Sequence, residues 1–113
     1  MVRVTKSVAE KWLGDVPQEK QFWCQDGRTF KSLSDLGIAF RDMSNGVFHH
    51  HVSATNNDFS NWVRDVIGDV KLSNDLRKSR SRLQATKNVA DRIAWLKSKI
   101  EAGKASRPEF KRS

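Results

Sequence analysis

Residues 56–69, NNDFSNWVRDVIGD, are the densest stretch of this 113-residue chain, and they decide the fold. The large apolar residues of this stretch lie at positions i, i+3, i+4, i+7 and i+8, which is the spacing of an amphipathic helix with one buried face. These residues are Phe59, Trp62, Val63, Val66 and Ile67. We therefore predict a core helix here rather than a site that performs chemistry.

Polar residues at both ends of this stretch support the helix. Asn56 or Asn57 can cap its start, and Asp58 in the first turn is favoured by the helix dipole. Gly68 follows the last apolar residue and can adopt the left-handed conformation that ends helices. Asp58 and Asp65 lie about 10 Å apart along the axis, with no His, Cys or Lys on the same turns. We interpret both carboxylates as capping and solvent-facing groups.

The chain length allows one domain with a modest core. We expect this domain to span residues 1–103, followed by a flexible basic tail over residues 104–113. Cys24 is the single cysteine, so no internal disulfide can form, which suits a reducing cytosol. The N-terminus lacks the apolar run of a signal peptide, and no stretch reaches membrane-spanning length. We expect a cytoplasmic protein without a membrane partner.

The N-terminal part predicts a short helix followed by a β-hairpin. Ser7 and Glu10 have the spacing of a capping box at the start of that helix, with Trp12 and Leu13 as its apolar anchors. Residues 20–32, KQFWCQDGRTFKS, have the pattern of a hairpin with an aromatic-rich first strand. Its Asp-Gly dipeptide at positions 26 and 27 predicts a tight primed turn.

The middle of the chain predicts two further helical segments. Ser32 and Asp35 form a second capping box, and the apolar residues after them repeat at helical intervals. These residues are Leu33, Leu36, Phe40 and Met43. Gly37 weakens such a helix by about 1 kcal/mol relative to Ala, which predicts a close packing contact there. The following SNGVFHHHV predicts one or two helical turns.

The C-terminal third predicts a short helix over residues 71–80, with Leu72 and Leu76 inward, and then a longer basic helix. Ser79 or Ser81 can cap the longer helix, and Gly103 is expected to end it. Its inward residues are expected to be Leu83, Val89, Ile93, Leu96 and Ile100. The predicted fold class is α+β: mostly helical, with one small N-terminal β-hairpin, short helices and a longer basic C-terminal helix.

Charge is the most informative global property. The chain has 21 Lys and Arg against 13 Asp and Glu, a net charge of +8. Residues 1–70 carry 8 basic and 9 acidic residues, whereas residues 71–113 carry 13 basic and 4 acidic residues. A one-sided excess of this kind indicates a polyanionic partner. The alternative is that Lys and Arg only keep a small protein in solution, but an even distribution of these residues along the chain would be enough for that.

The predicted nucleic-acid-binding residues lie in this basic third. Four of them crowd into six positions, and Ser79 and Ser81 between them can also donate to phosphate. Trp95 lies off the apolar stripe, so it is either an exposed aromatic available for stacking or part of a broader core face. The full predicted set is Arg77, Lys78, Arg80, Arg82, Arg92, Trp95, Lys97, Lys99, Lys104, Lys111 and Arg112.

The sequence gives no support for a metal, a cofactor or a reaction. His49, His50 and His51 are consecutive, so their side chains diverge and cannot jointly face one ion. A surface or partly buried polar role is the simpler interpretation. Cys24 beside Trp23 has the surroundings of a small buried hydrophobe rather than a nucleophile. No glycine-rich phosphate loop, serine elbow or pair of catalytic carboxylates is present.

Two segments, DGRTFKSLSDLGIAFRDMSNGVFHHHV and NDFSNWVRDVIGD, resemble a small domain of unknown function found in archaeal and some bacterial proteins. The resemblance covers about residues 22–78 and implies a compact shared domain without a known activity, so no catalytic residue is carried over. The matching positions are Asp26, Gly27, Ser32, Leu33, Met43, Phe48, His51, Val52, Asn57, Asp58, Phe59, Trp62, Val63, Asp65, Val66, Gly68 and Asp69.

Together these patterns predict a small, basic, non-enzymatic protein that binds the phosphates of nucleic acid through its C-terminal third. RNA in a ribosome-like particle and duplex DNA in chromatin both fit the charge. The alternative is a protein-interaction or regulatory module that docks an acidic protein partner.

Overall fold

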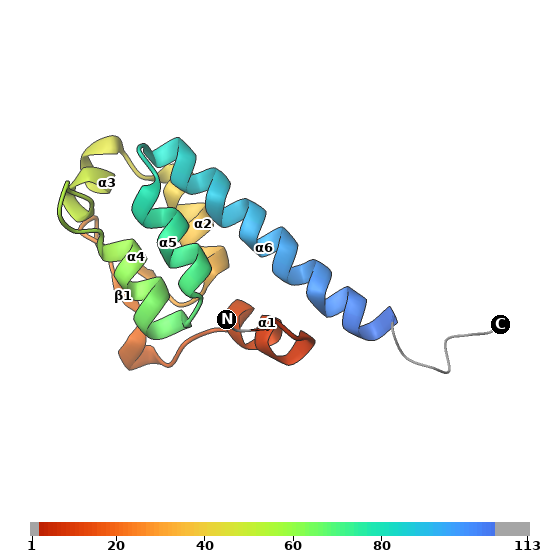
Figure 1. Ribbon diagram of the computed structural model, residues 1–113. Helices are drawn as coiled ribbons and strands as arrows, with labels where there is room; N and C mark the ends of the chain where they lie inside the picture. Colours follow the sequence, from red (N-terminus) through yellow and green to blue (C-terminus); the bar gives the residue numbers. More distant parts are fainter. Residues whose placement is uncertain (1–2, 106–113) are drawn as a thin grey trace.

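A computed structural model describes residues 3–105, and these residues form six α-helices and one two-stranded antiparallel sheet (Figure 1). The mostly helical α+β fold expected from the sequence is therefore confirmed. The elements in chain order are α1 (Lys6–Leu13), the 3-10 turn η1 (Gln18–Lys20), β1 (Phe22–Trp23), β2 (Thr29–Phe30), α2 (Leu33–Asp42), α3 (Asn45–His51), α4 (Asp58–Trp62), the π-helical segment η2 (Val63–Ile67), α5 (Val70–Lys78) and α6 (Arg82–Ala105).

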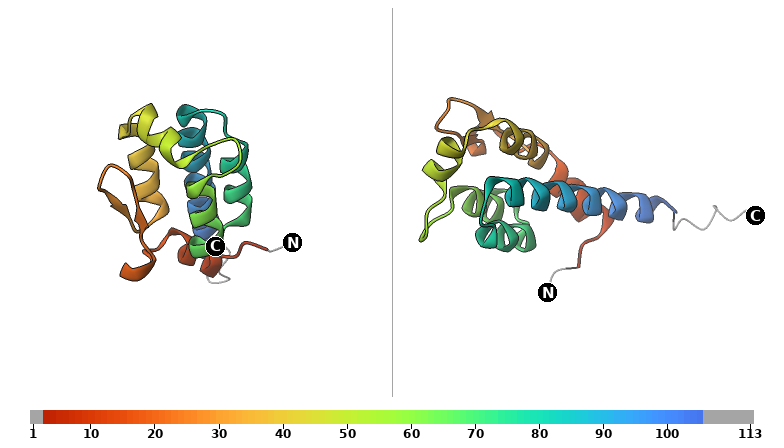
Figure 2. Two further views of the ribbon diagram at one scale, coloured as in Figure 1. Left: turned by 90° about the vertical axis from the view of Figure 1, so that its left-hand side faces the viewer. Right: turned by 90° about the horizontal axis from the view of Figure 1, so that it is seen from above.

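Helix α6 is the element against which α1, α2 and α5 pack. It runs between α2 and α5, as the right-hand view of Figure 2 shows, and α1 packs against its C-terminal half. Val89 and Leu96 are fully buried on the inner face of α6. A Cβ atom on Gly37 of α2 would lie 3.3 Å from the Val89 side chain, so α2 approaches α6 closely at this glycine. The close contact predicted at Gly37 is present.

Phe59 of α4 is the centre of an aromatic core. Its ring centroid lies 5.1 Å from Phe22 of β1, 4.9 Å from Phe40 of α2 and 5.9 Å from Phe48 of α3. Aromatic pairs at such distances each contribute about 0.5–1.5 kcal/mol beyond their buried area. The stretch NNDFSNWVRDVIGD thus joins the hairpin to two helices, and the prediction that it is a core element is confirmed.

Residues 58–67 of this stretch are helical, but the second half of the helix is wider than an α-helix. Asn57 caps α4, with its side-chain oxygen accepting from the Ser60 N–H at 2.9 Å. After Trp62 the chain continues as η2, and the Gly68 N–H donates to the Val63 carbonyl, five residues back, at 2.8 Å. Gly68 has a φ of +99°, the left-handed conformation that the sequence predicted.

The hairpin forms, with Phe22 paired to Phe30, but its turn differs from the prediction. The Gly27 N–H donates to the Cys24 carbonyl at 3.0 Å, so Gln25 and Asp26 are the central residues of the turn, and Gly27 follows with a φ of +95°. A three-residue loop of this type places glycine after the turn rather than within it. The predicted two-residue primed turn was therefore wrong.

Three details of α1 and α6 also differ from the predictions. Thr5, not Ser7, caps α1 by accepting from the Val8 N–H. Leu83 is 70% exposed, because Ala85 takes the buried position on the first turns of α6. Helix α6 continues through Gly103 to Ala105, and a Cβ atom on Gly103 would lie 2.8 Å from Lys6 Cβ. Gly103 thus lets α1 approach α6 rather than ending the helix.

Within residues 3–105, no helix combines the length and apolar character required to cross a lipid bilayer. Most of the tail predicted over residues 104–113, including Lys111 and Arg112, lies outside the described residues.

Candidate nucleic-acid interface

Arg77, Lys78 and Arg80 lie where α5 ends and α6 begins, and we call these three residues the basic corner. Arg77 and Lys78 occupy the last turn of α5, where positive charge interacts favourably with the helix dipole. Arg80 follows in the short connection to α6, and its backbone N–H donates to Gln84 Oε1 at 2.6 Å. The local chain therefore holds three cations within one tight turn.

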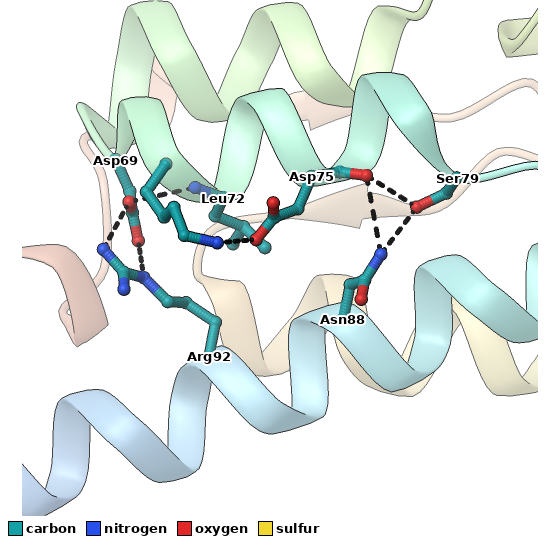
Figure 3. A network of polar contacts seen from close by, with 7 residues as sticks. Asp69, Leu72, Asp75, Ser79, Asn88 and Arg92 are labelled. Carbon is teal, nitrogen blue, oxygen red and sulfur yellow. Dashed lines mark hydrogen bonds and ion pairs between the residues drawn. The ribbon is translucent and has the colours of Figure 1, made fainter.

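Polar contacts between α5 and α6 fix the backbone of this turn (Figure 3). The buried Ser79 hydroxyl donates to the Asp75 carbonyl at 2.9 Å and accepts from Asn88 Nδ2 at 2.8 Å. At the opposite end of the helix pair, Arg92 forms an ion pair with the buried Asp69. Helix α5 is thus held to α6 at both of its own ends, so the basic corner is attached to a rigid support.

Residues 52–57, which connect α3 to α4, form the facing loop opposite the basic corner. Val52 and Asn57 pair in an isolated antiparallel bridge, and the Ser53 N–H donates to the Asn56 carbonyl at 2.8 Å. The Ser53 hydroxyl accepts from the N–H groups of Thr55 and Asn56. The facing loop is therefore a closed turn with its own hydrogen bonds.

Buried hydrogen bonds fix the facing loop relative to the basic corner. Asn57 Nδ2 donates to the Leu76 carbonyl in the last turn of α5 at 3.1 Å. Ser60 Oγ donates to the Ser73 carbonyl at 2.7 Å, and Ser73 Oγ donates to the Ser60 carbonyl at 2.9 Å. Both serines are fully buried, so α4 and α5 lie in direct contact. The facing loop and the basic corner are therefore held in a fixed relative position.

An open groove of about 700 Å³ lies between the basic corner on one side and the facing loop on the other. We call it the corner groove and its two sides its walls. None of its twelve lining residues is acidic. Lys78 and Arg80 make no side-chain hydrogen bond or ion pair within the described part of the chain, and Arg77 Nη1 donates to Asn74 Oδ1 at 3.3 Å. The lining residues are His49, Val52, Ser53, Ala54, Thr55, Asn56, Asn57, Asn61, Arg77, Lys78, Ser79 and Arg80.

Arg82 and Arg92, two further residues of the predicted set, have partners inside the protein. Arg82 Nη1 donates to the Phe40 carbonyl at 2.6 Å, and its Nε donates to Asn45 Oδ1 at 3.1 Å. Arg82 therefore ties α6 to the end of α2. The Arg92 guanidinium is held by both carboxylate oxygens of Asp69 and is only 12% exposed. These contacts give both arginines a structural role.

The remaining predicted residues on α6 do not extend the basic corner into one track. Lys97 and Lys99 are two residues apart, which places them about 200° apart around a helix. Lys97 borders a depression against α2, whereas Lys99 Nζ lies 4.9 Å from the centroid of the Trp95 ring. Lys104 forms an ion pair with Glu101 at 3.6 Å. The charges on α6 thus face different directions.

Trp95 is 39% exposed, so the structure settles the question that its position in the sequence left open. Its ring is not part of the buried core, but two cationic side chains lie against it. The Arg92 guanidinium lies 4.4 Å from its centroid, in addition to the Lys99 contact. Such cation–π contacts cover part of the ring that a nucleic-acid base would need for stacking.

His51 is engaged on both ring nitrogens. Its Nε2 accepts from the Gln25 N–H at 3.0 Å, so Nδ1 carries the hydrogen and donates to Asp58 Oδ2 at 2.9 Å. Asp58 is therefore more than the first-turn residue that the sequence predicted, because it orients a buried histidine. His49 and His50 are exposed. Within residues 3–105, no three His, Cys, Asp or Glu side chains are grouped as they would be around a metal ion.

Cys24 is buried beside the hairpin turn. Burial raises the pKa of the Cys24 thiol above its ordinary value of 9.0, and this effect exceeds the opposing hydrogen bond to the Asp26 backbone. A raised pKa disfavours the thiolate that nucleophilic chemistry requires. These surroundings are those of a small packing residue.

The sequence pointed to Arg77, Lys78 and Arg80 but missed the opposite wall of the groove. Asn56, Asn61 and the other residues of that wall are neutral and lie about twenty residues earlier in the chain. Neutral polar residues are ordinary in loops and on the exposed faces of helices, so no sequence signal distinguished them.

No protein-family model matches this chain, and neither a curated protein nor a solved structure matches it. The resemblance to a small domain of unknown function stays a prediction.

Proposed function

We propose that this protein binds nucleic acid through the corner groove and that it acts by binding rather than by catalysing a reaction. The observation that carries the proposal is the convergence of Arg77, Lys78 and Arg80 on one concave surface without a carboxylate among its lining residues. Phosphates are the commonest ligands for such a group of arginine and lysine side chains in nucleic-acid complexes.

The state of these side chains supports phosphate binding. Lys78 and Arg80 have no ionic partner among the described residues, so a phosphate would not have to break an existing ion pair to reach them. Arg77 retains donors beyond the one that faces Asn74. The backbone beneath them is clamped by Ser79 and Asn88, which lowers the entropy lost on binding.

Two further features fit this proposal. His51 and Cys24 belong to the residue types that most often act in catalysis. Here hydrogen bonds and burial hold both in structural roles. A single buried thiol also suits a reducing compartment, so we place the protein in the cytoplasm. The phosphates of either RNA or DNA would satisfy the basic corner.

The test is a fluorescence-anisotropy titration of labelled RNA and DNA at several salt concentrations. Each phosphate contact releases counterions, so log affinity should fall linearly with log salt by about 0.7–0.9 per contact. Arg77→Ala/Arg80→Ala should flatten that slope by about 1.5–2 if each arginine holds one phosphate. Binding should weaken for all nucleic-acid sequences alike, because phosphates carry no sequence information.

A matched control removes two positive charges elsewhere. Lys11 and Lys31 are exposed and do not line the groove. Lys11→Ala/Lys31→Ala changes the net charge equally and should leave the slope close to that of the wild type. Absence of binding at low salt, or an equal loss in both double variants, would contradict the proposal.

A second candidate function is supported by a depression of about 350 Å³ between α2 and α6. Ile38 on its border is 47% exposed, Arg41 and Lys97 flank it, and none of its nine lining residues is acidic. This combination suits an acidic, partly apolar protein partner. Ile38→Asp should abolish a stoichiometric protein complex and leave nucleic-acid affinity unchanged, whereas Arg77→Ala/Arg80→Ala should do the reverse.

A further inference from the structure

Building on the proposed function, we infer that the corner groove accepts a single strand of nucleic acid rather than a double helix. The phosphates lie against the basic corner, and the edge of an unpaired base lies against the amides of Asn56 and Asn61 on the opposite wall. The inference fails separately from the proposed function, because a protein that binds only duplex phosphates would still satisfy the latter.

The two sides of the corner groove differ in charge and chemistry. All three cations of the groove lie on the α5–α6 side, while the other side presents the amides of Asn56 and Asn61, the hydroxyls of the facing loop and the imidazole of His49. Neutral amides and hydroxyls can contact phosphates, but they can also hydrogen-bond to the edge of a base. A nucleotide has a charged side and a neutral hydrogen-bonding side, and the groove matches both.

The concave shape of the groove also favours a single strand. The base edges of a duplex lie at the bottom of its own grooves, and proteins reach them with a protruding helix or β-ribbon. Here Asn56 and Asn61 line a concave surface, which a double helix could only cover from outside. Bases that have left the stack can enter such a surface, as they do in most sequence-specific complexes with single strands.

Hydrogen bonds fix the orientation of the two amides. Asn61 Nδ2 donates to Asn56 Oδ1 at 3.1 Å, and Asn56 Nδ2 donates to Asp58 Oδ1 at 2.7 Å. Asp58 is itself held by the buried His51 ring. This relay leaves Asn61 Oδ1 and one amide hydrogen without a partner among the described residues. An adjacent acceptor and donor of this kind complement the edge of an unpaired base, adenine above all.

The exposed ring of His49 adds an aromatic surface to the same wall. It packs edge-on against the buried Phe48, with the ring centroids 5.2 Å apart, and this contact restricts the orientation of the His49 ring. Imidazole rings are among the surfaces on which unpaired bases stack. The groove therefore offers a base both hydrogen-bonding and stacking contacts.

The experiment compares one labelled DNA oligoadenylate as a single strand and after annealing to its complement, together with the corresponding RNA single strand. Anisotropy titrations at low salt should show at least one single strand binding about tenfold more tightly than the duplex, the equivalent of one good base contact. The difference between the DNA and RNA strands shows which sugar the groove prefers.

Asn61→Ala should lower single-strand affinity by about fivefold or more, while the salt dependence stays unchanged because no phosphate contact is lost. Gln18→Ala removes an exposed amide outside the groove and is the matched control. Thermal melting verifies that Asn61→Ala is folded, and Asn61→Ser replaces it if the melting temperature drops.

Duplex affinity equal to or greater than that of both single strands would overturn the inference, as would an Asn61→Ala protein with wild-type affinity. If the duplex binds with a salt slope that depends on Arg77 and Arg80, the proposed function survives and only the single-strand inference fails. If no nucleic acid binds at low salt, both fail.

Discussion

Arg92 of α6 donates two hydrogen bonds to the fully buried carboxylate of Asp69, at 2.7 Å from Nε to Oδ2 and 2.9 Å from Nη2 to Oδ1 (Figure 3). Asp69 Oδ1 also accepts from the Leu72 N–H at 3.2 Å and thereby caps α5. The same guanidinium lies 5.9 Å from the ring of Trp12 on α1. One ion pair thus joins three helices.

Arg92→Met should strongly destabilise the protein, because it leaves the Asp69 carboxylate buried without its counter-charge. Removal of one partner from a buried pair typically lowers the free energy of unfolding by about 3–5 kcal/mol. Urea denaturation of the wild type and the variant measures the loss. A loss below about 1 kcal/mol would mean that water or another cation compensates Asp69.

The double variant Asp69→Asn/Arg92→Met should be more stable than Arg92→Met alone, since asparagine is neutral and can still cap α5. Asp65→Asn is the control for the change from carboxylate to amide, because Asp65 is exposed and its one ion pair within residues 3–105 is with Arg64. It should unfold like the wild type.

Arg80 and Arg82 are two residues apart but should respond differently to alanine. Arg82→Ala removes the donor to the Phe40 carbonyl and should lower the free energy of unfolding by about 1.5 kcal/mol. Arg80→Ala should leave stability within about 0.5 kcal/mol of the wild type and reduce nucleic-acid affinity. Chemical denaturation and anisotropy on the same two proteins test the contrast. Equal effects on stability would refute the separation of structural and binding arginines.

His51→Phe should destabilise the hairpin end of the molecule. Phenylalanine keeps the aromatic contacts with Phe22 and Phe59 but leaves the Gln25 N–H and the Asp58 carboxylate without their ring partner. An unsatisfied group of this kind lowers stability by about 1–3 kcal/mol. Urea melts give the magnitude, and hydrogen exchange at the Gln25 amide should accelerate. An unchanged exchange rate would show that His51 does not protect that amide.

Asp26 should contribute to the acid sensitivity of the hairpin. The hydrogen bond from the Arg28 side chain holds the pKa of the Asp26 carboxyl below its ordinary value of 3.8. A folded-state pKa below the unfolded value means that the stabilisation is fully present above pH 3.8 and is lost as pH falls through the folded-state pKa. Asp26→Asn should therefore lose less stability than the wild type between about pH 6 and about pH 3. Identical losses in parallel urea melts would contradict this assignment.

The sequence by itself determined the local elements of this protein. Apolar spacing and capping residues placed α2, the α4–η2 segment, α5 and most of α6, because these signals act between residues three to eight positions apart. The same local rules limited the cap to Asn56 or Asn57 and predicted the left-handed Gly68, and the structure places the cap at Asn57. Errors arose where two residues close in sequence could both act as the cap, as with Thr5 and Ser7 at the start of α1.

The one-sided charge also indicated where to look for a binding surface, but only the tertiary structure decided which charges are available. Arg82 and Arg92 belong to the same basic third as Arg77 and Arg80, so the sequence does not separate them. In the structure they are engaged by Phe40 and Asp69, which lie 42 and 23 residues away. The neutral wall of the corner groove is likewise contributed by a distant segment. Contacts across such separations arise from how helices pack around a shared core, and no local pattern encodes them.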